Sequence, residues 1–146
     1  MIVLDASAMV ELLFGTSKGQ QVRDRYLGGG ESFHLPHLLD LDVVQVLRRY
    51  SNQRMVADQR IEQALQDFFD FPLTRHPHEA LLPCVWELRA NMTAYDAVYV
   101  ALAEVLTVPM VTCDGRLAHA PGHRAKLVLV SSRLLPSILK VPRWSS

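Results

Sequence analysis

Short apolar runs that alternate with helical segments constrain most strongly what this chain can fold into. Residues 2–4, 108–112 and 127–130 are short, largely apolar runs with β-branched side chains, typical of strands buried on both faces of a parallel sheet. Residues 33–35 and 71–74 are further candidates for extended structure. Because helical patterns separate these runs, the sequence predicts an α/β fold with a central, mostly parallel sheet flanked by helices.

The helical segments have recognisable beginnings and ends. Ser7 and Thr93 are predicted N-caps, and glycines at 15 and 28–30 are predicted to end helices. Pro83 must interrupt or restart a helical pattern that begins near His78. The other predicted helices cover residues 7–14, 17–27, 36–50, 57–69 and 94–106.

One aspartate is predicted to lie among apolar side chains within the helix over 36–50. Three- and four-residue spacing puts Asp42 on the same face as Leu39 and Val46. Asp40 points away from that face. A buried carboxylate without a partner costs several kcal/mol, so Asp42 needs a compensating group.

Length and composition favour one domain. With 146 residues, 49% of them apolar, the chain is predicted to form a single domain over 1–146, with 131–146 as a tail of uncertain structure. Residues 134–139 of this tail could form an amphipathic turn or two, and residues 141–146 are expected to fray. A signal peptide and a run of about 20 apolar residues are both missing, which predicts a cytoplasmic protein. Cys84 and Cys113 form no disulfide or zinc pattern and are predicted to be buried.

Charge is distributed unevenly, although the formal net charge is zero. No acidic residue follows Asp114, and a basic segment next to an acidic cluster suits an anionic polymer such as a nucleic acid. A solvated basic tail explains the pattern equally well. The six basic residues after Asp114 are Arg116, Arg124, Lys126, Arg133, Lys140 and Arg143.

Four aspartates, Asp5, Asp42, Asp96 and Asp114, occupy apolar surroundings. Asp5 and Asp114 come just after predicted strands, and ligands of open parallel sheets bind beyond the carboxyl ends of strands. Each also has a purely structural explanation, as a helix cap or a turn residue. Asp96 fits a capping box with Thr93, whereas Asp42 has no such explanation.

Gathered in one place, these carboxylates would suit Mg²⁺ or Mn²⁺. The reaction that follows is phosphodiester hydrolysis by a metal-activated water. Ser7 and Thr112, each two residues from an aspartate of the set, could support the carboxylates or a bound water, although capping is the expected role of Ser7.

Paired histidines raise zinc as an alternative metal. None of them has a third ligand at an established zinc-site spacing. These histidines are His34, His37, His76, His78, His119 and His123.

Four motifs together resemble a known family. They are MIVLDASA at 1–8, LDLDV leading to LRR within 39–49, TAYDA at 93–97 and TCDGRL at 112–117. In this order they closely resemble the motifs of PIN-domain ribonucleases of the VapC toxin type. The resemblance extends from Met1 to about Val130.

The resemblance implies a three-layer PIN-like fold and a Mg²⁺- or Mn²⁺-dependent endoribonuclease. Asp5, Asp42, Asp96 and Asp114 would form an acidic quartet around the metal. It also implies a toxin that cuts structured RNA involved in translation, forms a homodimer, and is inhibited by a cognate VapB-like antitoxin. The basic residues predicted to guide RNA are Arg116, Arg124 and Lys126.

One position departs from the family pattern. The second acid of the family is usually Glu, whereas this chain has the shorter Asp42, with Asp40 as a rival ligand. The departure leaves open a catalytically weakened PIN-like module that binds RNA or protein. A Mg²⁺-binding receiver domain is a further alternative, although the chain has no adjacent acid pair after its first strand.

Overall fold

The computed structural model describes residues 1–131. The predictions for the tail after Ser131 therefore lie outside the described residues. Within them, five strands form one parallel sheet in the order β3-β2-β1-β4-β5. The strands are β1 (Ile2–Leu4), β2 (Phe33–Pro36), β3 (Leu73–His76), β4 (Met110–Thr112) and β5 (Leu127–Leu129).

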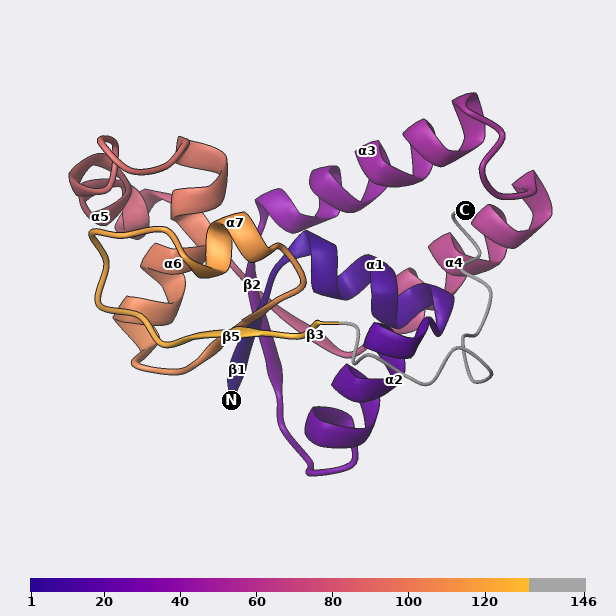
Figure 1. Ribbon diagram of the computed structural model, residues 1–146, viewed down its shortest axis with the longest axis horizontal. Coiled ribbons are helices and arrows are strands. Elements are labelled where there is room, and N and C mark those ends of the chain that lie inside the picture. The colour runs from indigo at the N-terminus through magenta and orange to yellow at the C-terminus, as the bar shows by residue number, and fades with distance from the viewer. Residues whose placement is uncertain (132–146) are drawn as a thin grey trace.

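Helices cover both faces of this sheet. Figure 1 shows α1 and α2 on one side of the strands and α5 and α6 on the other, so the molecule has three layers. The predicted α/β fold with a parallel central sheet is confirmed. The helices are α1 (Ala6–Phe14), α2 (Ser17–Val22), α3 (Leu38–Asn52), α4 (Asp58–Asp70), α5 (Leu82–Glu87), α6 (Ala94–Leu106) and α7 (Gly115–Ala118), with a π-helical turn at Arg23–Leu27 and a 3₁₀ turn at Glu79–Leu81.

The strand order creates a crevice at a defined place. From β1 the chain proceeds outward through β2 to β3, and it then returns to the other side of β1 to form β4 and β5. Ligands bind at such a reversal, beyond the carboxyl ends of the two central strands, which here are β1 and β4. Receiver domains have the order 2-1-3-4-5, so the topology argues against that alternative.

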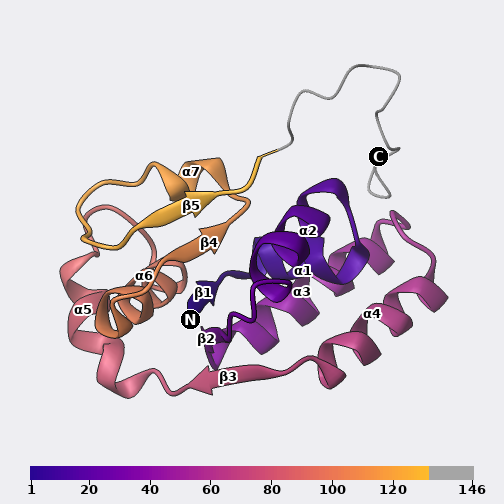
Figure 2. The ribbon, with the colours of Figure 1, turned by 90° about the horizontal axis from the view of Figure 1, so that it is seen from below.

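The helices α3 and α4 project from the sheet as a pair (Figures 1 and 2). In α3 the fully buried side chains are Leu39, Val43 and Leu47, which repeat every four residues and form the core face. Asp42 lies at the border of this face and is only half-buried. Among the described helices, none has both the length and the apolar character needed to cross a bilayer.

Three predicted boundaries differ from the structure. The first helix begins at Ala6 with Asp5 as its N-cap, so the prediction that Ser7 caps it was wrong. Pro36 ends β2 instead of opening α3, and the next amide, of His37, donates to the carbonyl of His76. The short α7 was not predicted, because four residues are too few to show a helical pattern.

Candidate active site

Asp5 is the most deeply buried aspartate of the predicted set. It is 5% exposed because it connects β1 to α1, where its carboxylate accepts a hydrogen bond from the Ala8 N–H at 3.0 Å. The hydroxyls of Ser7 and Thr112 donate to its two oxygens over 2.7 and 2.6 Å. Burial raises the pKa of Asp5 to about 6, with a smaller rise from Asp114, while the three hydrogen bonds lower the pKa.

Two hydroxyls join the ends of β1 and β4. The Thr112 hydroxyl, which donates to Asp5, also accepts from the Asp114 N–H at 3.0 Å. The Ser7 hydroxyl accepts from the Cys113 N–H at 2.9 Å. Ser7 and Thr112 therefore hold the Asp5 carboxylate against the start of the loop after β4, and Asp5 and Asp114 come from neighbouring strand ends as predicted.

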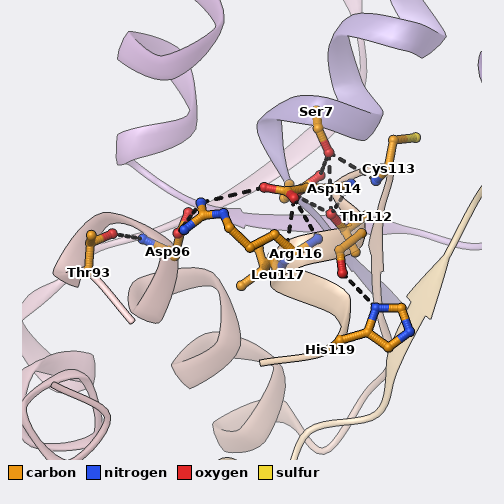
Figure 3. A network of polar contacts seen from close by, with 11 residues as sticks. Ser7, Thr93, Asp96, Thr112, Cys113, Asp114, Arg116, Leu117 and His119 are labelled. Carbon is orange, nitrogen blue, oxygen red and sulfur yellow. Dashed lines mark hydrogen bonds and ion pairs between the residues drawn. The ribbon is translucent and has the colours of Figure 1, made fainter. Parts of the chain in front are cut away.

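Arg116 lies between two aspartates of the set. Its guanidinium donates to Asp96 Oδ2 at 3.3 Å and lies 3.8 Å from Asp114 Oδ2. Figure 3 shows the side chain reaching from α7 across to Asp96 at the start of α6. Because this side chain is 77% exposed, solvent screens both ion pairs, and the contact is weak and reversible.

Asp96 lies in the first turn of α6. Thr93 is the N-cap, and its hydroxyl accepts from the Asp96 N–H at 3.2 Å. In the described part of the chain, the Asp96 carboxylate bonds to Arg116 and makes no return bond to the Thr93 backbone. The capping box is therefore only half formed, and the Asp96 carboxylate is directed toward the other aspartates.

Asp42 is held by a residue that the sequence did not single out. Tyr99 of α6 donates its hydroxyl to Asp42 Oδ2 at 2.6 Å. Partial burial raises the pKa of Asp42, nearby Asp96 adds to the rise, and the Tyr99 hydrogen bond opposes it. The pKa of Tyr99 is raised by burial first, and then by Asp42, Asp5 and Asp96.

These interactions connect all four aspartates through space. The charge of Asp114 raises the pKa of Asp5, and the charge of Asp96 raises the pKa of Asp42. The charges of Asp5, Asp42 and Asp96 raise the pKa of Tyr99. The fold thus gathers acids that are up to 109 positions apart in the sequence. As the side chains stand, no three acids, cysteines or histidines of the described residues are grouped closely enough to hold one ion.

Asp40, the rival of Asp42, is engaged elsewhere. The Arg75 Nε lies 2.9 Å from both of its carboxylate oxygens. This ion pair connects α3 to β3. Asp40 is therefore paired with Arg75, whereas Asp42 faces Tyr99 and Asp96.

Four of the six histidines lie in two pairs, and none forms the alternative zinc site among the described residues. His34 Nδ1 and His76 Nε2 are 2.9 Å apart and share a hydrogen bond. His78 Nε2 accepts from the Leu38 N–H at 2.9 Å, with the His37 ring 6.0 Å away from the His78 ring. Neither pair gains the third ligand that zinc needs.

Two of the three basic residues predicted to guide RNA lie away from the aspartates. Arg124 and Lys126 precede β5, at the amino-terminal end of the sheet, where the Lys126 carbonyl accepts from the Met110 N–H. They line a pocket together with Cys84 and Glu104. Only Arg116 is brought to the acidic site.

Both cysteines are half-buried, not fully buried as predicted. The Cys84 thiol donates to the Glu104 carboxylate at 3.0 Å. Burial raises the pKa of each thiol to about 12, so both remain protonated at neutral pH. Little of either thiol is therefore in the reactive thiolate form.

Comparison with known proteins assigns the family. The PIN domain model matches residues 2–122. The chain is 40% identical to "Ribonuclease VapC12" of Mycobacterium tuberculosis over 131 residues, covering 90% of this chain and all of that relative. The chain belongs to the PIN-domain family of VapC-like ribonucleases. "Ribonuclease VapC9" of the same species is also 40% identical over 130 residues, covering 89% of this chain and 98% of the relative.

Solved structures share the PIN fold at low sequence identity. PAE2754 from Pyrobaculum aerophilum superposes with a TM-score of 0.62 at 18% identity, over 86% of this chain and 81% of that one. VapBC2 from Rickettsia felis, bound to a DNA fragment from its promoter, also gives 0.62, at 13% identity over 91% and 100% of the two chains. The predicted resemblance to VapC-type PIN proteins is confirmed.

The donor set of this PIN site fits a hard divalent cation. All four side chains offer carboxylate oxygens, which Mg²⁺ and Mn²⁺ prefer. The Arg116 guanidinium already bridges Asp96 and Asp114, so these two carboxylates can share one cation. Direct contact by all four acids requires side-chain movement or bridging waters, since no three are grouped as ligands in this arrangement of the described residues.

Sequence reasoning missed Tyr99 and the position of Arg116. A signal for Tyr99 was present, because it follows Asp96 by three positions and so lies on the same face of the helix. Its partner Asp42 is 57 positions away, and only the packing of α3 near α6 reveals the pair. Arg116 could be recognised as basic, but not as the residue between two aspartates.

Proposed function

We propose that this protein is a metal-dependent endoribonuclease that acts as the toxin of a toxin–antitoxin pair. The observation that carries the proposal is the gathering of Asp5, Asp42, Asp96 and Asp114 at the reversal of strand order in a PIN-domain protein. The ribonuclease names of relatives with 40% identity support it.

Each acidic residue has a distinct part in this proposal. Asp5, fixed by Ser7 and Thr112, is the rigid member, while Asp96 and Asp114 are more exposed and can adjust. Asp42, on α3, contacts the metal either directly or through a bound water. When bound, Mg²⁺ or Mn²⁺ would lower the pKa of a water and offset charge at the scissile phosphate.

Basic groups would meet the RNA backbone. Arg116 stands at the site and can contact a phosphate once it leaves Asp96 and Asp114. Arg124 and Lys126, at the other end of the sheet, would reach only RNA that is distant from the cut.

The proposed toxin function also leads to a proposal for the partners and the location of the protein. We infer a homodimer that acts on RNA in the cytoplasm, held inactive by a VapB-like antitoxin, with residues 1–146 as one domain. Two structural neighbours are a toxin–antitoxin complex from Klebsiella pneumoniae and VapBC2 from Rickettsia felis. Co-expression with the product of a neighbouring short reading frame should yield a stable complex.

Cleavage of RNA tests the function. Purified protein should cut structured RNA when Mg²⁺ or Mn²⁺ is added, and EDTA should stop it. Asp96→Asn should abolish cutting, while Glu62→Gln, at an exposed site on α4, should not. Metal binding without cleavage of any RNA would instead support the weakened binding module, and full activity of Asp96→Asn would refute the assignment.

A further inference from the structure

Tyr99 is a buried tyrosine whose hydroxyl makes one hydrogen bond within the described residues. Only 3% of the residue is exposed, and it lies in the longest run of buried residues in the described part of the chain, where every residue from Ala97 to Ala103 is buried. Its hydroxyl ends at Asp42 Oδ2, 2.6 Å away. A buried Tyr usually places its hydroxyl on a partner, and the partner here is an acid of the proposed metal site.

The placement of this phenol connects two acids of the site. Asp96 and Tyr99 are three residues apart on α6 and share one face of that helix. Through Tyr99, α6 holds the Asp42 carboxylate of α3 within electrostatic reach of Asp96. Among the described residues, Tyr99 is the one hydrogen-bond donor to the Asp42 side chain.

The same contact distinguishes Asp42 from Asp40. The carboxylate of Asp40 pairs with Arg75 of β3, an edge strand that carries none of the four aspartates. Asp42 receives a neutral donor at one oxygen, which leaves its negative charge and its second oxygen available. An Asp is one methylene shorter than the Glu usual in this family, so its reach depends more on how it is held.

We propose that Tyr99 is a positioning residue that fixes the Asp42 carboxylate toward the metal and so lets an Asp serve as the second acid. The proposal rests on the proposed metal site. Groups that orient metal-binding carboxylates typically change metal affinity 10- to 100-fold when they are removed. The Tyr99 hydroxyl should therefore influence metal binding without touching the ion.

Calorimetric titration with Mn²⁺, in the full-length protein and without RNA, tests this role. Tyr99→Phe removes only the hydroxyl and should weaken Mn²⁺ binding about tenfold or more. Tyr95→Phe is the matched control, since Tyr95 lies one turn earlier on α6 and is 68% exposed; its Mn²⁺ affinity should be unchanged. Thermal unfolding of both metal-free variants verifies that each is folded.

A double-mutant cycle separates positioning from general packing. In an Asp42→Ala background Tyr99→Phe should cause no further loss of Mn²⁺ affinity, because the hydroxyl acts through Asp42. Equal losses in both backgrounds, or a folded Tyr99→Phe protein with native affinity, would overturn the proposal. If instead Asp96→Asn retains native Mn²⁺ affinity, the proposed metal site itself is wrong.

Discussion

At the scale of single residues, hydroxyl groups hold two of the four acids of the site in place. The four aspartates could be chosen from the sequence because each stands in an apolar context. What each one touches could not be predicted, since Thr112 reaches Asp5, and Tyr99 reaches Asp42, across more than 50 positions. The contacts of Ser7 could not be predicted either. Its place in the sequence fits a helix cap, whereas in the structure its hydroxyl bonds to the Asp5 carboxylate and the Cys113 N–H.

Replacing Thr112 by Val should destabilise the protein. The buried hydroxyl donates to the carboxylate of Asp5, and hydrogen bonds to charged groups contribute about 1.5–3 kcal/mol. The free energy of unfolding, measured with urea, should fall by about that amount. Thr74→Val, at an exposed strand position, should change it by less than about 0.5 kcal/mol; equal effects would contradict the role given to Thr112.

Removing the positive charge of Arg116 should strengthen metal binding. In Arg116→Ala no guanidinium competes for Asp96 and Asp114, and an exposed ion pair of about 0–1 kcal/mol corresponds to an increase in Mn²⁺ affinity of up to about fivefold. Arg89→Ala, whose guanidinium stacks on Trp86, should have no effect in the same titration. Weaker binding by Arg116→Ala would show that Arg116 does not compete with the ion.

At the scale of elements, the sequence predicts the strands and long helices well and the junctions poorly. Apolar runs and caps identify β1, β4, α4 and α6 because local pattern and burial agree. The end of β2 depends on a distant partner, because the His37 N–H donates to the His76 carbonyl. The starts of α1 and α7 are set locally by Asp5 and Asp114, which cap the helices and also belong to the site.

The contact between α1 and α2 should tolerate no side chain at Gly19. A methyl group there would lie 1.9 Å from the Glu11 carbonyl oxygen, so the helices would have to separate. Gly19→Ala should lower the free energy of unfolding by about 1–3 kcal/mol. At Gly115 of α7 a methyl group would lie 4.0 Å from the Leu129 side chain, an ordinary van der Waals contact. Gly115→Ala should therefore be neutral or stabilising by up to about 1 kcal/mol; a stable Gly19→Ala protein would refute this packing.

The pairing of β2 with β3 should depend on pH. Burial lowers the pKa of His34, and the charges of His76 and the chain's amino terminus lower it further. A base with a lowered pKa in the folded state takes up its proton more readily when unfolded, so stability is full above the ordinary pKa of about 6.5 and declines as pH falls below it.

Urea unfolding between pH 8 and pH 5 measures this effect. His34→Gln should reduce the loss of stability over that range, whereas His119→Gln, at the C-cap of α7, should leave the slope unchanged. An identical pH dependence in the native and His34→Gln proteins would exclude His34 as its source.

At the scale of the whole molecule, function depends on topology. The reversal between β1 and β4 brings Asp5 and Asp114 to one crevice, and α3 and α6 add Asp42 and Asp96 from other parts of the chain. The family resemblance predicts which acids gather. Only the three-dimensional structure separates Asp42 from Asp40 and places Arg124 and Lys126 at the far end of the sheet.

The most direct test of the central claim is Mn²⁺ affinity in five single variants compared with the native protein. Asp5→Asn, Asp42→Asn, Asp96→Asn and Asp114→Asn should each weaken Mn²⁺ binding at least tenfold, while Asp40→Asn should bind as the native protein does. Native affinity in Asp96→Asn, or a loss confined to Asp40→Asn, would contradict a shared metal site at this crevice.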